Sequence, residues 1–162
     1  MKNKLINEIK ASFPAKSINE SLSRMIIAAL VCQLDPTIDE LADIKTAVSE
    51  AVTNCIVHGY SESDGDIFLT AQYYEDNLIK ISIKDKGRGI EDVKQAMEPL
   101  YTTDDSGERS GMGFPIMQSF MDKIKVISKP NRGTTVIFSK KIKKEQAEPA
   151  PKRLTPATKN GD

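Results

Sequence analysis

The amino-acid sequence predicts an α+β fold: a two-layer α/β sandwich with a mixed, mostly antiparallel sheet and helices on one face. Strand patterns cluster beside helical patterns, without the regular strand–helix–strand alternation that builds a parallel sheet. Isoleucines at positions 79, 81 and 83 alternate with polar residues, which predicts a strand with one buried face. The chain has 162 residues, which is the length of one ordinary domain.

The first part of the chain predicts one strand and two helices. An apolar segment at residues 5–13 predicts the strand, and Ser17-Ile18-Asn19-Glu20 follows with the spacing of a capping box. This box is expected to open a helix that the Asp35-Pro36 pair ends. A second capping box, Thr37-Ile38-Asp39-Glu40, is expected to open a helix that Gly59 stops.

The second part of the chain predicts four more strands and two short helices. The strands are expected in two antiparallel pairs, each joined by a turn-like segment. A glycine-containing stretch without apolar periodicity, from Leu100 to Ser110, is expected to form a long loop. The expected strands cover residues 67–74, 78–85, 124–128 and 134–139, and the expected helices cover residues 92–97 and 113–121.

Composition near residue 140 predicts the end of the folded unit. Residues 141–162 are rich in Lys, Pro, Ala and Glu and nearly lack large apolar side chains, so they cannot bury enough surface to offset their ordering entropy. We therefore expect a folded domain over residues 1–140 and a disordered tail over residues 141–162.

Charge and cysteine content narrow the classes of function. The chain has 23 Lys and Arg against 23 Asp and Glu, so an overall electrostatic attraction to nucleic acid or to an acidic membrane is not expected. Cys32 and Cys55 lie in apolar helical patterns and are expected to be small buried side chains, as in a reducing cytoplasm. The longest apolar stretch, residues 25–32, is too short to cross a bilayer. We therefore expect a cytoplasmic protein with no direct nucleic-acid or membrane partner.

Three polar residues share a face of the second predicted helix. Glu50, Asn54 and His58 are four residues apart, which keeps their side chains on one side, opposite the apolar stripe. On the helix alone, this arrangement fits a solvated polar stripe as well as a reactive site. A histidine near a helix end is also commonly structural, because the C-terminal end of the dipole stabilises its charged form.

Two glycine-containing segments complete the candidate site. Asp85-Lys86-Gly87-Arg88-Gly89 follows a predicted strand, and its glycines allow the backbone to approach a ligand closely while Asp85 accepts a hydrogen bond. The loop before Gly113 leads into a helix N-terminus, which favours phosphate binding. Taken singly, the first segment also fits a surface turn and the second an ordinary surface loop.

Together, these segments resemble the Bergerat-fold (GHKL) ATPases and kinases, which include gyrase and the histidine kinases. The resemblance covers most of residues 1–140 and is closer to the bacterial anti-sigma factor serine kinases, through residues 48–60 and 108–114. The matching boxes are Glu50-Ala51-Val52-Thr53-Asn54, Asp85-Lys86-Gly87-Arg88-Gly89-Ile90, Gly107 with Gly111-Met112-Gly113, and Gly133-Thr134-Thr135.

The resemblance implies a role for each residue of these boxes. Glu50 is implied as general base on a serine hydroxyl, and Asn54 as the ligand of a Mg²⁺ ion that bridges the phosphates of ATP or ADP. Asp85 is implied to bind the adenine amine, with Thr134 near the same ring. Further nucleotide contacts are implied for Gly87, Gly89, Ile90, Thr103, Gly107, Ser110, Gly111, Met112 and Gly113.

The resemblance also implies protein partners. They are an RNA polymerase sigma factor of the sporulation type, an anti-anti-sigma protein that is phosphorylated on serine, and a second copy of this chain in a homodimer. Arg24 and Arg109 are candidate contacts for the sigma factor and the anti-anti-sigma protein, although each also fits a solvated surface arginine. The acidic pair Asp104-Asp105 departs from the expected pattern of the lid.

Other functions remain open at this point. The chain also fits a general stress-response or phosphatase-switch anti-sigma kinase, and a nucleotide-gated binding module without kinase activity. A detached histidine-kinase ATP domain fits poorly, because the only histidine, His58, stands in the same helix as Glu50 and Asn54.

Overall fold

One five-stranded antiparallel sheet organises the chain in the computed structural model, which describes residues 3–99 and 111–143. Its strands lie in the order β1-β2-β3-β5-β4. All four neighbouring pairs of described strands are antiparallel, so the mixed pairing allowed by the sequence prediction does not occur among them. The strands are β1 (Leu5–Pro14), β2 (Asp66–Tyr74), β3 (Leu78–Lys84), β4 (Lys123–Ser128) and β5 (Thr134–Lys141).

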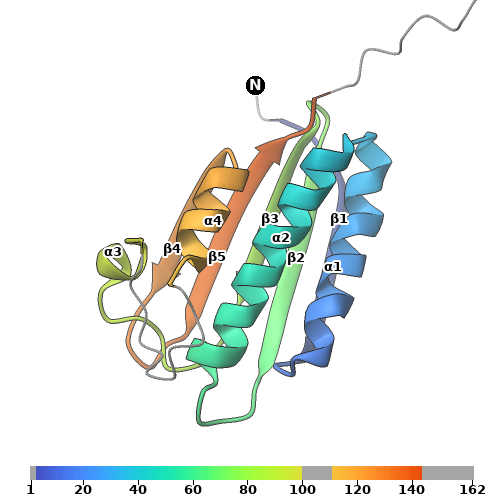
Figure 1. Cartoon of the computed structure of the whole chain (residues 1–162). Helices are drawn as coiled ribbons and strands as arrows, with labels where there is room; N and C mark the ends of the chain where they lie inside the picture. Colours follow the sequence, from blue (N-terminus) through green and yellow to red (C-terminus); the bar gives the residue numbers. More distant parts are fainter. Residues whose placement is uncertain (1–2, 100–110, 144–162) are drawn as a thin grey trace, which may run out of the picture.

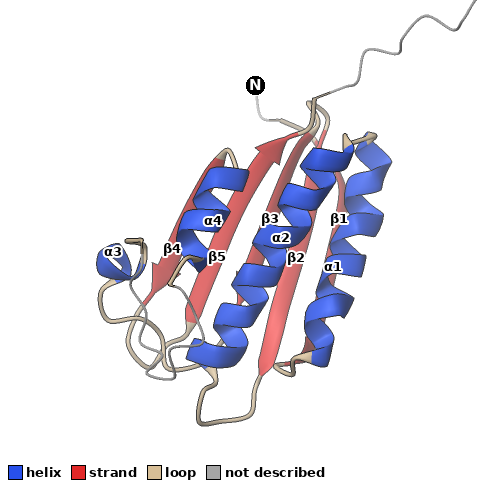
Figure 2. Cartoon of the chain, in the orientation of Figure 1, coloured by secondary structure: helices blue, strands red, loops and turns tan. Residues whose placement is uncertain are grey.

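The helices lie on one face of this sheet, which confirms the predicted two-layer α+β fold (Figure 1 and Figure 2). Helices α1, α2 and α4 run alongside the strands, whereas the short helix α3 stands at the rim beside β4. The helices are α1 (Ile18–Val31), α2 (Ile38–Asn54), α3 (Val93–Ala96) and α4 (Gly113–Phe120). A 3-10 turn (Cys32–Leu34) follows α1, and a π-helical turn (Cys55–Gly59) extends α2.

The core lies between the sheet and the helices. Ile79, Ile81 and Ile83 of β3 are fully buried, which confirms the alternation in the sequence. The apolar stripe of α2 packs onto them, because residues such as Ile44 and Val48 recur at helical spacing and are also fully buried. Burial of this stripe fixes the rotation of α2 and therefore directs its polar side chains away from the sheet.

A capping box fixes the start of α2, as predicted. Thr37 Oγ1 accepts a hydrogen bond from the Glu40 N–H at 3.1 Å, and Glu40 Oε2 accepts one from the Thr37 N–H at 3.0 Å. The second oxygen of this carboxylate accepts from the Lys143 N–H, just after β5. Glu40 is consequently buried, and it connects the start of α2 to the chain that leaves the sheet.

Two sequence predictions about α1 are wrong. Ser17 has helical backbone angles and makes no side-chain cap hydrogen bond, because the chain already turns tightly through residues 14–16. Cys32 is exposed rather than buried, since α1 ends at Val31 and the 3-10 turn rotates this side chain outward. Cys55 is buried, as predicted.

The structure describes the predicted domain boundary near residue 140, but not the predicted loop or most of the predicted tail. Strand β5 continues to Lys141, and Ile142 after it is buried against the core, so ordered structure extends past residue 140. The predicted long loop, residues 100–110, and most of the predicted tail, residues 144–162, lie outside the described residues. Within residues 3–99 and 111–143, no helix is long and apolar enough to cross a membrane.

Candidate functional site

The C-terminal end of α2 meets the N-terminus of α4, and this contact brings two predicted boxes together. Glu50 and Asn54 lie in the last turns of α2 and are half-buried. A Cβ atom added to Gly113 would lie 3.2 Å from Glu50 Oε2 and 3.5 Å from the amide atoms of Asn54. The predicted base and the predicted metal ligand therefore face the start of a helix whose N–H groups can bind anionic groups.

A π-helical turn changes the direction of the chain just after Asn54. It spans Cys55–Gly59 and contains His58, which is half-buried. The grouping of His58 with Glu50 and Asn54 assumed an α-helix, whereas His58 lies in this π-helical turn. The turn also delivers Gly59 to Asp85, because a Cβ atom on Gly59 would stand 3.0 Å from both Cγ and Oδ1 of that carboxyl group.

Asp85 is the most deeply buried acid in the described part of the chain, with 2% of its surface exposed. It follows β3, and its Oδ1 atom accepts hydrogen bonds from the Gly87 N–H at 2.9 Å and the Thr134 N–H at 3.2 Å. The Cys55 thiol makes a further hydrogen bond to the carboxylate. A carboxylate has lone pairs for about four partners, so capacity remains to accept an amine.

Burial raises the pKa values of both Asp85 and Cys55. Loss of solvent raises the pKa of Asp85 above its usual value, although hydrogen bonds from Gly87, Thr134 and Cys55 partly oppose the shift. Burial and the nearby Asp85 charge raise the pKa of the Cys55 thiol well above its usual value. Cys55 is therefore a neutral donor that holds the Asp85 carboxylate, and not a reactive thiolate.

Close backbone approaches explain the glycines around Asp85. A Cβ atom on Gly87 would stand 1.9 Å from the Gly59 carbonyl oxygen, and one on Gly133 would stand 2.2 Å from the Asp85 carbonyl oxygen. Gly89 and Gly133 also have positive φ angles of 72° and 75°, which a residue with a side chain adopts only with strain. The Gly-x-Gly motif and the glycine before β5 thus form one packed backbone unit.

Thr134 and Ile90 join this unit through one serine. Ser128 Oγ donates to the Gly133 carbonyl oxygen at 3.0 Å and accepts from the Ile90 N–H at 2.8 Å. Its distance to Thr134 Oγ1 is 2.8 Å, and the Thr134 hydroxyl must donate here because the single Ser128 proton is already used. The sequence prediction missed Ser128, since nothing in its pattern sets it apart from other strand-end serines.

Tyr60 is a second residue that the sequence prediction missed. Its hydroxyl group accepts from the Lys86 N–H at 2.8 Å and donates to the Asp66 carbonyl oxygen at 2.7 Å. Its ring fills the space beside Gly65, where a Cβ atom would stand 2.1 Å from the ring. Tyr60 therefore fixes the segment after the π-helical turn to the Asp85 motif, a role that only the fold reveals.

The predicted phosphate segment is described only from Gly111 onward. Gly111 has a positive φ of 66°, Met112 precedes the helix, and Gly113 begins α4. Of these three residues, Gly113 stands next to Glu50 and Asn54. Thr103, Gly107, Arg109 and Ser110 lie outside the described residues.

Arg24 lies on α1 and reaches α2 beside the site. Its guanidinium group donates to Ser49 Oγ at 2.8 Å and to Ser21 Oγ at 3.0 Å, and it pairs with Glu20 one turn earlier on α1. Because Ser49 precedes Glu50, this network connects the half-buried arginine to the end of α2 that carries the site.

The side chains at this site can be tested against the ligands that the implied Mg²⁺ ion would need. Among the described residues, no group of three or more His, Cys, Asp or Glu side chains could hold a metal ion alone. Mg²⁺ commonly takes one or two protein oxygen ligands and completes its octahedron with phosphate and water. The Asn54 amide oxygen beside the start of α4 fits this type of site.

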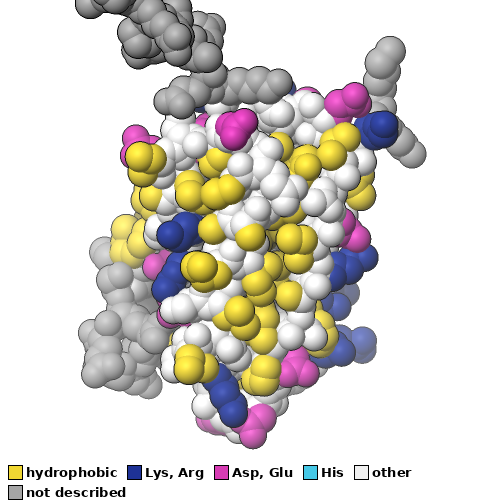
Figure 3. All heavy atoms as spheres, turned by 90° about the vertical axis from the view of Figure 1, so that its right-hand side faces the viewer, with side chains coloured by type: hydrophobic (Ala, Val, Ile, Leu, Met, Phe, Trp, Pro, Cys, Tyr) yellow, Lys and Arg dark blue, Asp and Glu magenta, His cyan; other side chains and the backbone are white. Residues whose placement is uncertain are grey.

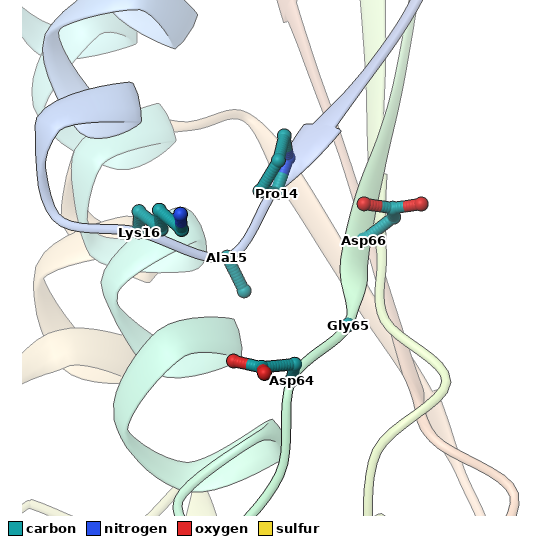
Figure 4. A pocket seen from close by; sticks show the side chains of 6 residues that line it. All are labelled: Pro14, Ala15, Lys16, Asp64, Gly65 and Asp66. Carbon is teal, nitrogen blue, oxygen red and sulfur yellow. The ribbon is translucent and has the colours of Figure 1, made fainter.

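A separate shallow pocket of about 390 Å³ lies between the end of β1 and the start of β2. Figure 4 shows that the carboxylates of Asp64 and Asp66 point in different directions, so they do not form a paired acidic site. The pocket contains none of the residues around Asp85. Its lining consists of Pro14, Ala15, Lys16, Asp64, Gly65 and Asp66.

Comparison with known proteins finds a matching family and similar proteins. Residues 13–140 match the family described as "Histidine kinase-like ATPase domain". The Anti-sigma F factor of Halalkalibacterium halodurans is 50% identical over 142 residues, which cover 87% of this chain and 97% of the relative. The Anti-sigma F factor of Thermoanaerobacter sp. is 53% identical over 136 residues, which cover 84% of this chain and 94% of the relative.

A solved structure is also similar in fold. The RsbU and RsbW domains of a Mycobacterium tuberculosis protein match with a TM-score of 0.63 and 18% identity, over 85% of this chain and 33% of that one. The two Anti-sigma F factors match this chain over nearly their whole length and at higher identity, so they show the family as well as the fold. The chain therefore belongs to the histidine kinase-like ATPase family, in its branch of anti-sigma F factors.

Proposed function

We propose that this protein binds and inhibits an RNA polymerase sigma factor of the sporulation type, and that it phosphorylates a serine of an anti-anti-sigma protein with ATP. The observation that carries the proposal is the meeting of three groups at one place: Glu50, Asn54 and the start of α4 at Gly113. The names of the relatives at 50% and 53% identity support the sigma-factor activity.

The nucleotide would be held at both ends by groups already in position. The buried Asp85 carboxylate would accept the adenine amine, and Thr134 lies beside it through its N–H group. Asn54 would contribute its amide oxygen to a Mg²⁺ ion, which neutralises phosphate charge when bound. The N–H groups at the start of α4 would receive the phosphates.

Glu50 would then serve as the base of the transfer. Its carboxylate would accept the proton of the serine hydroxyl as that oxygen attacks the terminal phosphorus, and ADP would leave. A general base typically contributes about 10²–10⁴-fold to the rate. The contact between α2 and α4 would orient the carboxylate, because a Cβ atom at Gly113 would already stand 3.2 Å from Glu50 Oε2.

A second copy of the chain is part of this proposal. Helix α1 carries exposed apolar residues at helical spacing, Ile18, Leu22 and Met25, with 78%, 45% and 68% exposure. Leu5 and Ile6 of the neighbouring edge strand β1 are also exposed, at 43% and 47%. Figure 3 shows hydrophobic side chains gathered over this side of the molecule. Such a surface is typical of a protein–protein interface and supports a homodimer.

The test is transfer of labelled phosphate from Mg-ATP to a small anti-anti-sigma protein. Glu50→Gln should lower the rate by about 10²-fold or more and leave the ATP dissociation constant nearly unchanged. Glu62→Gln removes an exposed acid of the following loop and should behave like the wild type. Tight ATP binding without transfer by the wild type would leave only a nucleotide-gated binding module.

The sigma-factor activity needs its own measurement. Purified protein should capture a sporulation sigma factor, and the affinity should differ between the ATP and ADP states because each nucleotide biases the partner complex. Failure to capture that sigma factor in any nucleotide state, with ATP binding intact, would contradict this part of the proposal. Capture of a stress-response sigma factor instead would assign the protein to another pathway.

A further inference from the structure

The face of the sheet opposite the helices is uncovered among the described residues (Figure 1). Strand register arranges its outward side chains in rows that cross the sheet. In one row, Lys80 of β3 pairs with Ser139 of β5, which pairs with Lys123 of β4. In the next row, Ser82 pairs with Ile137, which pairs with Lys125.

Charge is distributed unevenly on this face. The outward positions of β3, β5 and β4 include five exposed lysines and no acidic residue. These lysines are Lys80, Lys84, Lys123, Lys125 and Lys141. By contrast, the β1 side pairs Lys10 with Glu8 at 2.8 Å. In Figure 3, Lys and Arg side chains follow the right-hand edge of the molecule, the side on which the uncovered face lies.

Most of these positive charges have no acidic partner. Lys141 lies 3.5 Å from Asp76 in the β2–β3 turn, but the other four lysines make no ion pair with any described residue. Neighbouring strands are about 4.8 Å apart, so Lys80 and Lys123 stand roughly 10 Å apart across β5. The Debye length at physiological salt is about 8 Å, so salt weakens the repulsion between the two charges without abolishing it.

Neither solubility nor edge protection explains this arrangement. Acidic residues would solubilise the face equally well. The chain has 23 Asp and Glu, yet none of them stands at these outward positions. Lysines protect edge strands from aggregation. Lys80 and Lys84, however, lie on β3, the central strand, where no edge needs protection. An unpaired cluster of like charges on a neutral protein points to a ligand that supplies the opposite charge.

We propose that the outward face of β3, β5 and β4 is a docking surface for an acidic amphipathic helix of a partner protein. The lysines would pair with its carboxylates. Between the lysines, the outward side chains of Leu78, Ile127 and Ile137 offer apolar contact, and Ile127 is 47% exposed. A helix on this face would complete a third layer, as helices do on the opposite face.

Two other anionic partners fit the face less well. Single-stranded nucleic acid is bound by stacking on aromatic rings, and no outward residue of these three strands is aromatic. None is an arginine, the residue that most often reads guanine in duplex DNA. A membrane is flat, whereas a sheet twists by about 20–25° per strand, so the lysines do not lie in one plane.

The experiment titrates the ¹⁵N-labelled full chain with a 16-residue amphipathic peptide that carries glutamates beside a leucine stripe. We expect amide shifts in residues 78–84, 123–128 and 134–141. The double variant K80E/K125E should weaken binding by at least tenfold. K16E/K94E changes the same charge at two exposed lysines away from this face and should bind within twofold of the wild type.

Control ligands test whether an acidic helix is the partner that binds this face. A peptide with glutamine in place of glutamate should not bind, and K80E/K125E should bind ATP like the wild type because the site around Asp85 is intact. Shifts confined to other elements, or equal losses in both double variants, would overturn the proposal. So would tighter binding of a 20-base-pair DNA duplex or of phosphatidylglycerol vesicles through the same lysines.

Discussion

At the scale of single residues, Asp85 combines a structural cost with the adenine-binding role that we propose for it. Its carboxylate is almost fully buried, and burial raises its pKa above the usual value. Folding therefore disfavours the ionised form, which is the form that would accept the adenine amine in the proposed complex. Gly87, Thr134 and Cys55 offset part of this cost by donating to the carboxylate. These three donors thus hold the Asp85 carboxylate in one position.

Asp85→Asn should separate the two effects. The variant keeps an oxygen for the Gly87 and Thr134 N–H groups, but it loses the charge and turns an amide N–H donor toward the adenine amine, which is also a donor. A lost hydrogen bond to a charged group is worth about 1.5–3 kcal/mol, so ATP binding should weaken by at least tenfold in calorimetry.

The stability of the same variant should move in the other direction. A raised pKa of Asp85 in the folded state means that its contribution to stability is present at low pH and lost as pH rises through that pKa. At pH 7 the melting temperature of the variant should therefore not fall below that of the wild type, and its advantage should shrink as the pH is lowered. Unchanged ATP affinity would refute the role assigned to Asp85.

Tyr60→Phe tests the residue that sequence analysis missed. The loss of its hydroxyl removes hydrogen bonds to Lys86 and Asp66 and should cost about 0.5–1.5 kcal/mol of folding free energy. ATP affinity should also fall several-fold, because the Asp85 motif loses its attachment. Tyr74→Phe, which removes a hydroxyl bonded to Gln72, is the matched control. Equal ATP affinity in the two variants would argue against a positioning role for Tyr60.

At the scale of elements, two identical sequence patterns have different outcomes. Ser17 and Thr37 each begin a Ser/Thr-x-x-Glu motif, yet only Thr37 has extended backbone angles and forms the box. Ser17 is already helical because Asn19 and the preceding turn hold the chain through the Pro14 carbonyl oxygen. The motif specifies which atoms can pair, but the backbone that brings them together is set by packing.

Thr37→Ala should therefore be costly, whereas Ser17→Ala should not. Loss of an N-cap typically costs about 1 kcal/mol, which lowers the melting temperature by roughly 4 °C for a domain of this size. Ser17→Ala removes no cap hydrogen bond and should change the melting temperature by less than half as much. Thermal unfolding followed by circular dichroism makes the comparison, and equal losses would contradict the observed difference in capping.

The candidate site was predictable from sequence wherever residue type determines the chemistry. Asp85, Asn54 and the glycines have few substitutes, so their spacing carried the prediction. His58 shows the limit of that reasoning, because it lies in a π-helical turn and no spacing rule signals such a turn. Ser128 and Tyr60 were missed for a related reason: their roles depend on strands and turns that meet only after folding.

At the scale of the whole molecule, the apolar side of α1 and β1 predicts self-association. Met25→Glu places a charge in the middle of the exposed stripe, where the wild-type side chain is 68% exposed, and should shift the protein to monomers without unfolding it. Ile127→Glu makes the same change on β4 at the far edge of the sheet and should leave association intact. Sedimentation velocity distinguishes the outcomes, and a monomeric wild type would refute the dimer.

The contrast between the two cysteines makes the protein convenient to label. Cys32 is exposed in the turn that precedes α2, while Cys55 is buried at the other end of that helix with a raised pKa. A maleimide dye should therefore attach at one position without any mutagenesis. Helix α2 has 17 residues, so the dye would stand about 25 Å from Asn54. At that distance a fluorescent nucleotide could report occupancy by energy transfer without steric interference from the probe.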